Sequence, residues 1–330
     1  MNFQEKWRPS ASLINIRLRA EVYGKIRRFF NDRFALEVET PLLGRYGSSH
    51  PEISHLRSYY HTSGERAEGG RLDLMLQSSP EHAMKRLIAA GSGSIYQICK
   101  AFRAGESDET HNPEFTILEW YRLGETHRTL MYEVADLLRV LIPSITIKQV
   151  PYGELFERYV GIDPHQCDMA ELERWMSVRL PHSDVVSAMR DKATAIDIIF
   201  SVAVQPELNA LAACVMAYDY PEEMACNSRV SAGTPRKAER FEVFLGGIEI
   251  ANGYHEETSA TEQRSRFNSE NDRRIALGMS AVPVDELLIT AINSGLPSCA
   301  GVALGIDRLL MFLVNAESID DVLAFPLSRV

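Results

Sequence analysis

One arginine, one aromatic ring and one carboxylate fall together in a hairpin that we predict around a polar loop at residues 104–113. Apolar and polar residues alternate on both sides of this loop, with the period of two that is typical of β-strands. Arg103 stands at one end of the loop, and Phe115, Glu119 and Tyr121 share one strand face because their positions have the same parity. Together they suit a phosphate, a flat base and an ammonium group, whereas any one of them alone fits a surface ion pair equally well.

A second hairpin, with its turn at Gly246-Gly247, carries two glutamates. Glu242 and Glu249 can meet across it, and two close carboxylates repel each other unless a cation joins them. Mg²⁺ prefers oxygen ligands and bridges to the phosphates of nucleotides. The pattern indicates a magnesium site, with two solvated glutamates at a sheet edge as the alternative.

The segment at residues 299–313 reads as a strand of small residues that enters a helix through Gly305. Gly301 and Gly305 would let a ligand approach the backbone, and Asp307 is suited to the helix start. Arg308 lies in the first turn, where the helix dipole already favours an anion. This segment is therefore a third candidate for phosphate binding.

Further elements must position these residues. Helical spacing predicts a helix over Ser12–Phe34, and a strand over residues 35–41 that stops at Pro41. Ser79 and Pro80 are typical of the start of a helix over Glu81–Ala89. The other elements that we predict are strands over residues 72–76, 209–218 and 248–251, helices over 126–141, 258–277 and 284–294, helical stretches within 151–205, and a loop over 221–235.

Composition indicates an ordinary globular protein. The chain has 330 residues, of which 45% are hydrophobic and 24% charged, and a net charge of −10, which gives no support for a nucleic-acid surface. No run approaches the roughly 18 apolar residues that span a bilayer, and the start has no signal-peptide core. Five scattered cysteines fit a reducing cytosol, so we expect a cytoplasmic protein that does not bind membranes. His50, His55 and His61 fit no compact ligand motif, and we predict no metal there.

The string that runs from Arg103 through HNPEFT closely resembles motif 2 of class II aminoacyl-tRNA synthetases, above all of their lysyl branch. GVALGIDR, which ends at Arg308, resembles motif 3. The helix and strand that end at Pro41 resemble motif 1, which builds the dimer interface in that family. Three motifs in this order cover residues 17–330.

The resemblance implies an α+β fold, the class II synthetase core with an antiparallel sheet flanked by helices. It implies one catalytic domain over residues 1–330, with an insertion at about 145–235 between motifs 2 and 3. It also implies a homodimer. Motif 1 begins near Arg17, which leaves no room ahead of it for an anticodon-binding domain.

The implied first reaction is attack of an amino-acid carboxylate on the α-phosphate of ATP, with release of pyrophosphate. The resemblance assigns Arg103 to the α-phosphate and the carboxylate, Arg308 to the γ-phosphate, and Glu242 and Glu249 to Mg²⁺. No general base is needed, because the carboxylate is already ionised at neutral pH. The implied ATP-binding residues are Arg103, Ala104, Gly105, Glu106, His111, Asn112, Phe115, Glu249, Ile250, Gly305 and Arg308.

The lysyl-branch string EIxNGxxE matches residues 249–256, and in that branch its asparagine, aromatic residue and last glutamate belong to the amino-acid pocket. An SPE element, here Ser79 to Glu81, faces the substrate amine there. The implied residues for lysine are Ser79, Pro80, Glu81, Glu119, Tyr121, Asn252, Tyr254, Glu256 and Ala303.

The sequence departs from lysyl-tRNA synthetases at two positions. Gly105 replaces a glutamate that reads adenine, although Glu106 follows and can substitute if the loop shifts. Ala303 stands where those synthetases typically have glycine, and one added methyl group is worth about 1–3 kcal/mol of discrimination. We therefore expect β-lysine to be preferred to α-lysine.

A short, acidic, lysyl-type core of this kind resembles the elongation factor P lysyltransferase family. Those proteins activate lysine, by preference (R)-β-lysine, and attach it to a lysine of elongation factor P, so that protein is the expected partner and tRNA is not. The alternatives are a truncated synthetase that charges tRNA, a non-catalytic binding module on the same fold, and an ammonia-dependent asparagine synthetase. Joint retention of Arg103, Arg308, Glu242 and Glu249 disfavours the binding module, and the amine-type pocket disfavours the asparagine synthetase.

Overall fold

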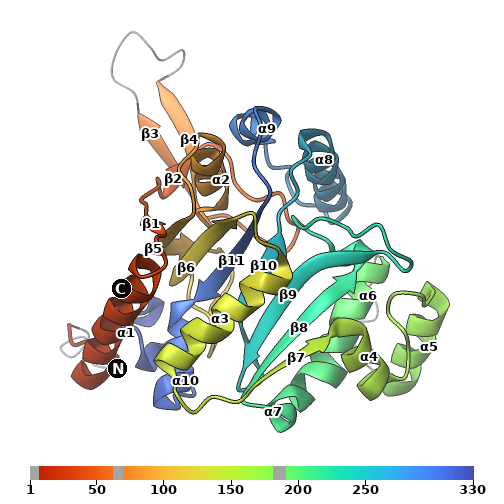
Figure 1. The fold of residues 1–330 in the computed structure, drawn as a ribbon. Coiled ribbons are helices and arrows are strands. Elements are labelled where there is room, and N and C mark those ends of the chain that lie inside the picture. The colour runs from red at the N-terminus through yellow and green to blue at the C-terminus, as the bar shows by residue number, and fades with distance from the viewer. Residues whose placement is uncertain (1–6, 62–69, 181–190) are drawn as a thin grey trace. The chain divides into compact units, whose positions relative to one another are not determined.

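The computed structural model describes residues 7–61, 70–180 and 191–330 (Figure 1), so only residues 7–10 of the polar N-terminal arm fall within it. The chain divides into two compact units. Unit 1 comprises Met1–Gly124, Glu257–Ser298 and Ala303–Val330. Unit 2 comprises Glu125–Glu256 and Cys299–Val302. Within the described residues, no helix is long and apolar enough to cross a membrane.

Unit 1 begins with helix α1, Leu13–Asn31, as helical spacing predicted. Ser12 caps it, because its Oγ accepts a hydrogen bond from the N–H of Asn15 at 3.1 Å. The strand that we predicted over residues 35–41 is mostly wrong, because β1 covers only Leu36–Glu37. This strand pairs in parallel with β5 at two positions, and Pro41 lies in irregular backbone beyond it.

The predicted motif 2 hairpin is confirmed. Strands β5, Ile95–Phe102, and β6, Glu114–Leu123, pair antiparallel without a break from Ile95↔Tyr121 to Phe102↔Glu114. Behind it, the ring of Phe30 from α1 stacks on Tyr96 of β5 at 4.5 Å between centroids and meets Trp120 of β6 edge-on. This aromatic packing fixes the hairpin, and with it both ends of the motif 2 loop.

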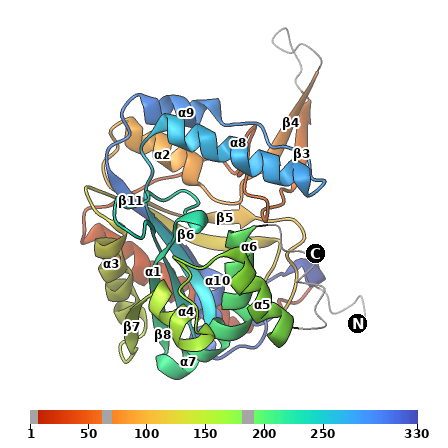
Figure 2. The same cartoon turned by 90° about the vertical axis from the view of Figure 1, so that its right-hand side faces the viewer.

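The rest of unit 1, in the residues that the structure describes, consists of a small sheet, four helices and two short turns. A small sheet has the strand order β2-β4-β3. Helix α9 packs against both α2 and α8, and the three lie side by side in Figures 1 and 2. The elements are β2 Leu43–Gly44, β3 Arg57–His61, β4 Arg71–Leu76, α2 Glu81–Ala89, α8 Ala260–Ala276, α9 Glu286–Asn293 and α10 Ile306–Val314, with short 3₁₀ turns at Ile319–Asp321 and Leu327–Arg329. Strand β11, Cys299–Gly305, is shared between the units, since its last three residues belong to unit 1.

Unit 2 contains four consecutive neighbours in the strand order β10-β9-β8-β7. Pairs β10–β9 and β9–β8 are antiparallel, and β8–β7 is parallel. Within this unit, α3 packs on β9 and β10, while α4 packs on β8, and Figure 2 shows them on opposite faces. The elements are α3 His127–Leu141, β7 Ile147–Pro151, α4 Tyr152–Val160, α5 Met169–Arg179, α6 Lys192–Ile199, α7 Leu208–Leu211, β8 Cys214–Pro221, β9 Lys237–Leu245 and β10 Ile248–His255, with a π-helical turn at Phe200–Val204 and 3₁₀ turns at Gln205–Glu207 and Glu222–Met224.

The strand that we predicted over residues 209–218 is partly wrong. Its first residues form the short helix α7, and the strand starts only at Cys214. After Asn209, the run from Ala210 to Tyr218 is apolar, so its periodicity does not separate a buried helix from a buried strand. The helices predicted within 151–205 are present, except that residues 181–190 lie outside the described part of the chain.

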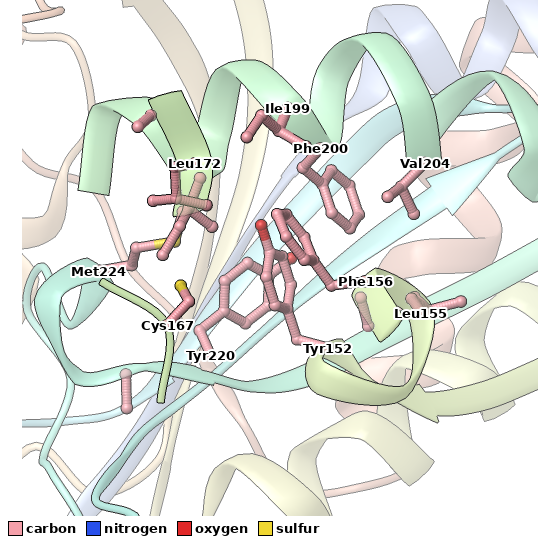
Figure 3. Packing of buried hydrophobic residues seen from close by; sticks show 14 of the residues in the cluster. Tyr152, Leu155, Phe156, Cys167, Leu172, Ile199, Phe200, Val204, Tyr220 and Met224 are labelled. Carbon is pink, nitrogen blue, oxygen red and sulfur yellow. The ribbon is translucent and has the colours of Figure 1, made fainter. Parts of the chain in front are cut away.

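The segment between motifs 2 and 3 packs a core of its own against the strands of unit 2 (Figure 3). The ring of Tyr152 stacks on Phe200 at 4.7 Å and lies 4.2 Å from the ring of Tyr220. All three residues are buried, and this packing leaves the Tyr220 hydroxyl directed at one side chain of β9. That side chain belongs to a predicted site residue, Glu242.

Candidate active site

Arg103 follows directly after β5, and its backbone N–H donates to the carbonyl of Pro113 at 2.9 Å, which closes the base of the motif 2 loop. Its guanidinium carbon lies 5.2 Å from the ring centroid of Phe115. Its nearest charged partner is Glu106, with 3.7 Å between Nη1 and Oε1, and about a third of both side chains is exposed. Gly105 has a φ of +85°, the left-handed conformation that glycine adopts without strain. Arg103 thus keeps its charge accessible beside an aromatic ring.

Arg308, in the first turn of α10, reaches the opposite end of the same loop. Its Nε donates to the carbonyl of Thr110 at 3.3 Å, and its Nη2 donates to Nε2 of His111. On the other side of the ring, Nδ1 of His111 lies 2.8 Å from Oδ1 of Asp108. Burial opposes ionisation of Asp108, but hydrogen bonds from Thr110 and His111 lower its pKa to about 2. The structure therefore brings the motif 3 arginine to the motif 2 loop within unit 1.

Two side chains of this region, those of Asn112 and Asp307, form hydrogen bonds within the protein that stabilise the fold. Asn112 is 8% exposed; its Nδ2 donates to the carbonyl of Glu114 at 2.7 Å and its Oδ1 accepts from the N–H of Leu327 at 2.9 Å. Asp307 lies in the first turn of α10, at the helix start as predicted, although the cap position itself is Gly305. Its carboxylate instead accepts from Arg19 of α1 and from the N–H of Thr116 on β6, both at 2.6 Å.

The proposed amine-binding residues of unit 1 form a hydrogen-bonded chain around a buried carboxylate. Glu119 is 2% exposed, and its two oxygens accept from the hydroxyls of Ser79 and Tyr121, each at 2.7 Å. Ser79 Oγ also accepts from the N–H of Glu81, although the cap position of α2 is Pro80 and not a serine. The two hydroxyl groups therefore orient the Glu119 carboxylate beside the start of α2.

Glu81 itself already has a cation beside it. Nζ of Lys85 lies 2.6 Å from its Oε1, and the Lys85 side chain is 1% exposed. Burial raises the pKa of Glu81, but Lys85 and His82 outweigh burial and lower it. Within the SPE element, it is therefore Ser79 that contacts the buried carboxylate, while Glu81 holds the first turn of α2.

In unit 2 a β-bulge brings the second set of residues onto one face. Glu249 pairs with Phe244 and Asn252 with Glu242, and the register shifts between Glu249 and Ala251. In a regular strand a spacing of three would place Glu249 and Asn252 on opposite faces, and the extra residue, Ile250, restores the same face. By the same parity Tyr254 lies on the face of Asn252.

Glu242 is held by three donors. Tyr220 donates to its Oε2 at 2.8 Å, Asn252 to its Oε1 at 3.3 Å, and Arg240 forms a short contact with the same Oε1. Glu242 and Glu249 are not direct cross-strand partners, since Glu242 pairs with Asn252 and Glu249 with Phe244, but strand parity places both on the same face of the hairpin. Burial and the Glu242 carboxylate raise the pKa of Tyr220 well above its usual value, so the phenol stays a donor.

Sequence analysis missed one cluster of ligating side chains. His127, Glu239 and His255 offer ligand atoms that lie within 4.8 Å of one another, and all three belong to unit 2. The histidines stand in no common motif and are far apart along the chain, so spacing gave no signal.

The comparisons with known proteins identify the family of the chain. The family model for class II tRNA synthetases (D, K and N) matches residues 5–329. The chain therefore belongs to the class II tRNA synthetase family, and its α+β fold is the one predicted.

Its curated relatives narrow the family further. An elongation factor P–(R)-β-lysine ligase of Vibrio vulnificus is 42% identical over 98% of both chains. Ligases of the same name from Vibrio cholerae and Sodalis glossinidius are each 40% identical, over 98% and 100% of both chains, respectively.

Proposed function

We propose that this chain is an ATP-dependent ligase that activates lysine, preferably (R)-β-lysine, as an adenylate and transfers it to a lysine of elongation factor P. The observation that carries the proposal is its 40–42% identity to ligases of that name over 98–100% of the chain. The predicted recognition of this family is confirmed by the same comparison.

Unit 1 supplies the groups that we assign to the nucleotide. Arg103 would bind the α-phosphate and the amino-acid carboxylate, Arg308 the γ-phosphate, and Phe115 would stack on adenine. Charge builds on phosphate oxygens when the carboxylate oxygen attacks the α-phosphorus and pyrophosphate leaves, so fixed cations lower the barrier. His111 and Asn112 would act by shaping the loop, since the first orients Arg308 and the second binds backbone.

Glu242 and Glu249 would hold Mg²⁺, which when bound neutralises phosphate oxygens. The residues present fit this role: both offer carboxylate oxygens from one face of the hairpin. Oε2 of Glu242 accepts a hydrogen bond from the Tyr220 hydroxyl and has a second lone pair for a metal. Arg240 fixes the same carboxylate in place.

For the amino acid, we assign Glu119, Tyr121 and Ser79 of unit 1 to the ammonium group of the lysine side chain. In unit 2, the family resemblance assigns Asn252, Tyr254 and Glu256 to lysine binding. Ala303 is half-buried on β11, on the face opposite to the side chains of Val302 and Leu304, and its methyl group would favour the β-amino isomer.

We further propose a cytoplasmic homodimer built on α1, which exposes Leu13, Ile14 and the neighbouring Phe34 and Leu36. The net charge of −10 gives little attraction for a polyanion, so a protein lysine is the more natural acceptor than tRNA.

Two assays test the proposal in sequence. Amino-acid-dependent exchange of pyrophosphate into ATP should be faster with (R)-β-lysine than with α-lysine. Purified elongation factor P should then become labelled, and a variant of it with arginine in place of the acceptor lysine should not. Efficient charging of lysine tRNA without labelling of elongation factor P would contradict the acceptor, and absent exchange with either lysine would contradict the enzyme.

A further inference from the structure

A cluster of two histidines and a glutamate lies on the α3 side of the β9–β10 hairpin. His127 is the first residue of α3, Glu239 lies on β9, and His255 is the last residue of β10. Their ligand atoms lie within 4.8 Å of one another. By strand parity, Glu239 and His255 occupy the face opposite to Glu242 and Asn252, so the cluster is separate from the carboxylates assigned to magnesium.

His127 is 6% exposed, and one of its two ring nitrogens, Nε2, lies beside a carboxylate. Its Nε2 lies 2.8 Å from Oδ1 of Asp219. An ionised carboxylate only accepts, so the proton of a neutral His127 is on Nε2, and Nδ1 presents a lone pair. In the part of the chain that the structure describes, this buried Nδ1 has no hydrogen-bond partner. Buried polar atoms of this kind are rare and call for an occupant.

The other two side chains complete a ligand set. His255 is 8% exposed, and its Nδ1 lies 2.5 Å from Oε2 of Glu239. Two imidazoles and one carboxylate form a set that suits Zn²⁺, whereas Mg²⁺ prefers oxygen ligands alone. Asp219 would be the outer carboxylate that fixes the ring of a ligating histidine.

We propose that His127, Glu239 and His255 bind one Zn²⁺-like divalent cation, with Nδ1 as the ligand atom of His127 and solvent in the remaining position. The ion joins the start of α3 to both strands of the hairpin. Because His255 directly precedes Glu256, the ion also fixes the backbone of a residue that we assign to the lysine pocket. Its role is structural, and it is independent of which acceptor the enzyme uses.

The experiment uses the full chain, stripped of metal with a chelator and titrated with Zn²⁺ by calorimetry, with Mg²⁺ as a parallel titrant. We expect one Zn²⁺ per chain, an unfolding temperature that rises with Zn²⁺, and no comparable response to Mg²⁺. His127→Ala and His255→Ala should each abolish the stoichiometric site. Asp219→Asn should weaken it by about 10–100-fold. His165→Ala is the matched control, because His165 is a half-buried histidine of unit 2 outside the cluster and should bind Zn²⁺ like the wild type.

Circular dichroism shows which variants fold, and Co²⁺ decides the question on the wild type if they do not. A tetrahedral Co²⁺ spectrum without a thiolate charge-transfer band supports the cluster. A thiolate band, an octahedral spectrum, no stoichiometric Zn²⁺ binding by the wild type, or unchanged binding by folded His127→Ala and His255→Ala proteins would each overturn the proposal.

Discussion

The two sets of site residues hold their charges in opposite ways. In unit 1, Arg103 has one loose partner, Glu106 at 3.7 Å, and both side chains are about a third exposed. In unit 2, the Arg240 side chain is 6% exposed and that of Glu242 16%, and Tyr220 and Asn252 add further hydrogen bonds. Arg103 can therefore exchange its exposed partner at little cost, whereas the buried pair of Arg240 and Glu242 is held in place by its neighbours.

The largest effect should follow the loss of either arginine of unit 1. Arg103→Ala and Arg308→Ala should each lower (R)-β-lysine-dependent pyrophosphate exchange by about 100-fold or more. Each variant lacks a cationic hydrogen-bond donor for the negative charge that builds on the phosphate oxygens in the transition state. The unfolding temperature of Arg103→Ala should stay close to that of the wild type, since Glu106 is solvent-accessible.

The control for these variants is Arg264→Ala. Arg264 forms an exposed ion pair with Glu286 in unit 1, and its loss should leave exchange unchanged. Near-normal exchange by both Arg103→Ala and Arg308→Ala would remove these residues from the nucleotide site.

Removal of Arg240 should instead lower the stability of the protein through its effect on unit 2. Arg240→Ala leaves the Glu242 carboxylate buried without its cation, and it should lower the free energy of unfolding by about 3–5 kcal/mol. Urea denaturation measures this loss. Arg240→Lys keeps the charge and should lose less stability than Arg240→Ala. An Arg240→Ala protein as stable as the wild type would show that the stability of unit 2 does not depend on the ion pair between Arg240 and Glu242.

Two glycines, one in the exposed motif 2 loop of unit 1 and one in the packed hairpin of unit 2, test the same difference between the units. A Cβ on Gly253 would lie 2.5 Å from Cε1 of Phe241 and 3.0 Å from Cβ of Val302, so Gly253→Ala should destabilise the protein by about 1–3 kcal/mol. A Cβ on Gly105 would meet nothing within 4 Å, and only its φ of +85° makes alanine unfavourable, by about 1 kcal/mol. Thermal unfolding of both variants gives the order, and a larger loss for Gly105→Ala would contradict a tightly packed hairpin in unit 2.

Sequence patterns predicted the elements whose formation depends on residues close together along the chain. Alternation gave the β5–β6 hairpin, and cap chemistry gave the start of α1 at Ser12. Patterns did not predict the bulge at Ile250, because parity assumes a regular strand, nor the length of β1, which is set by pairing with β5. Arg240 was also missed as the partner of Glu242, because an (i, i+2) pair on a strand face carries no motif.

The smallest effect concerns the support of α2, which begins just after Ser79. His82 of α2 lies 3.0 Å from Oδ2 of Asp285, whose Oδ1 caps α9 through the N–H groups of Leu287 and Leu288. Burial raises the pKa of Asp285, but His82 and the two N–H groups outweigh it and lower the pKa below its usual value. This carboxylate therefore stabilises the fold fully above its unfolded pKa of about 3.9, and the contribution is lost as the pH falls through the lower, folded value.

Asp285→Asn keeps an oxygen that can cap α9 and removes only the charge. It should cost roughly 1 kcal/mol at pH 6, and the difference from the wild type should shrink as the pH falls from about 4 toward 3. Chemical denaturation at a series of pH values measures both, with Asp73→Asn, a change at an exposed aspartate of β4, as the control. A difference that stays constant from pH 6 to 3 would mean that Asp285 holds α2 by its shape and not by its charge. The helix packing of unit 1 would then depend less on buried charges than the Arg240–Glu242 pair of unit 2 does.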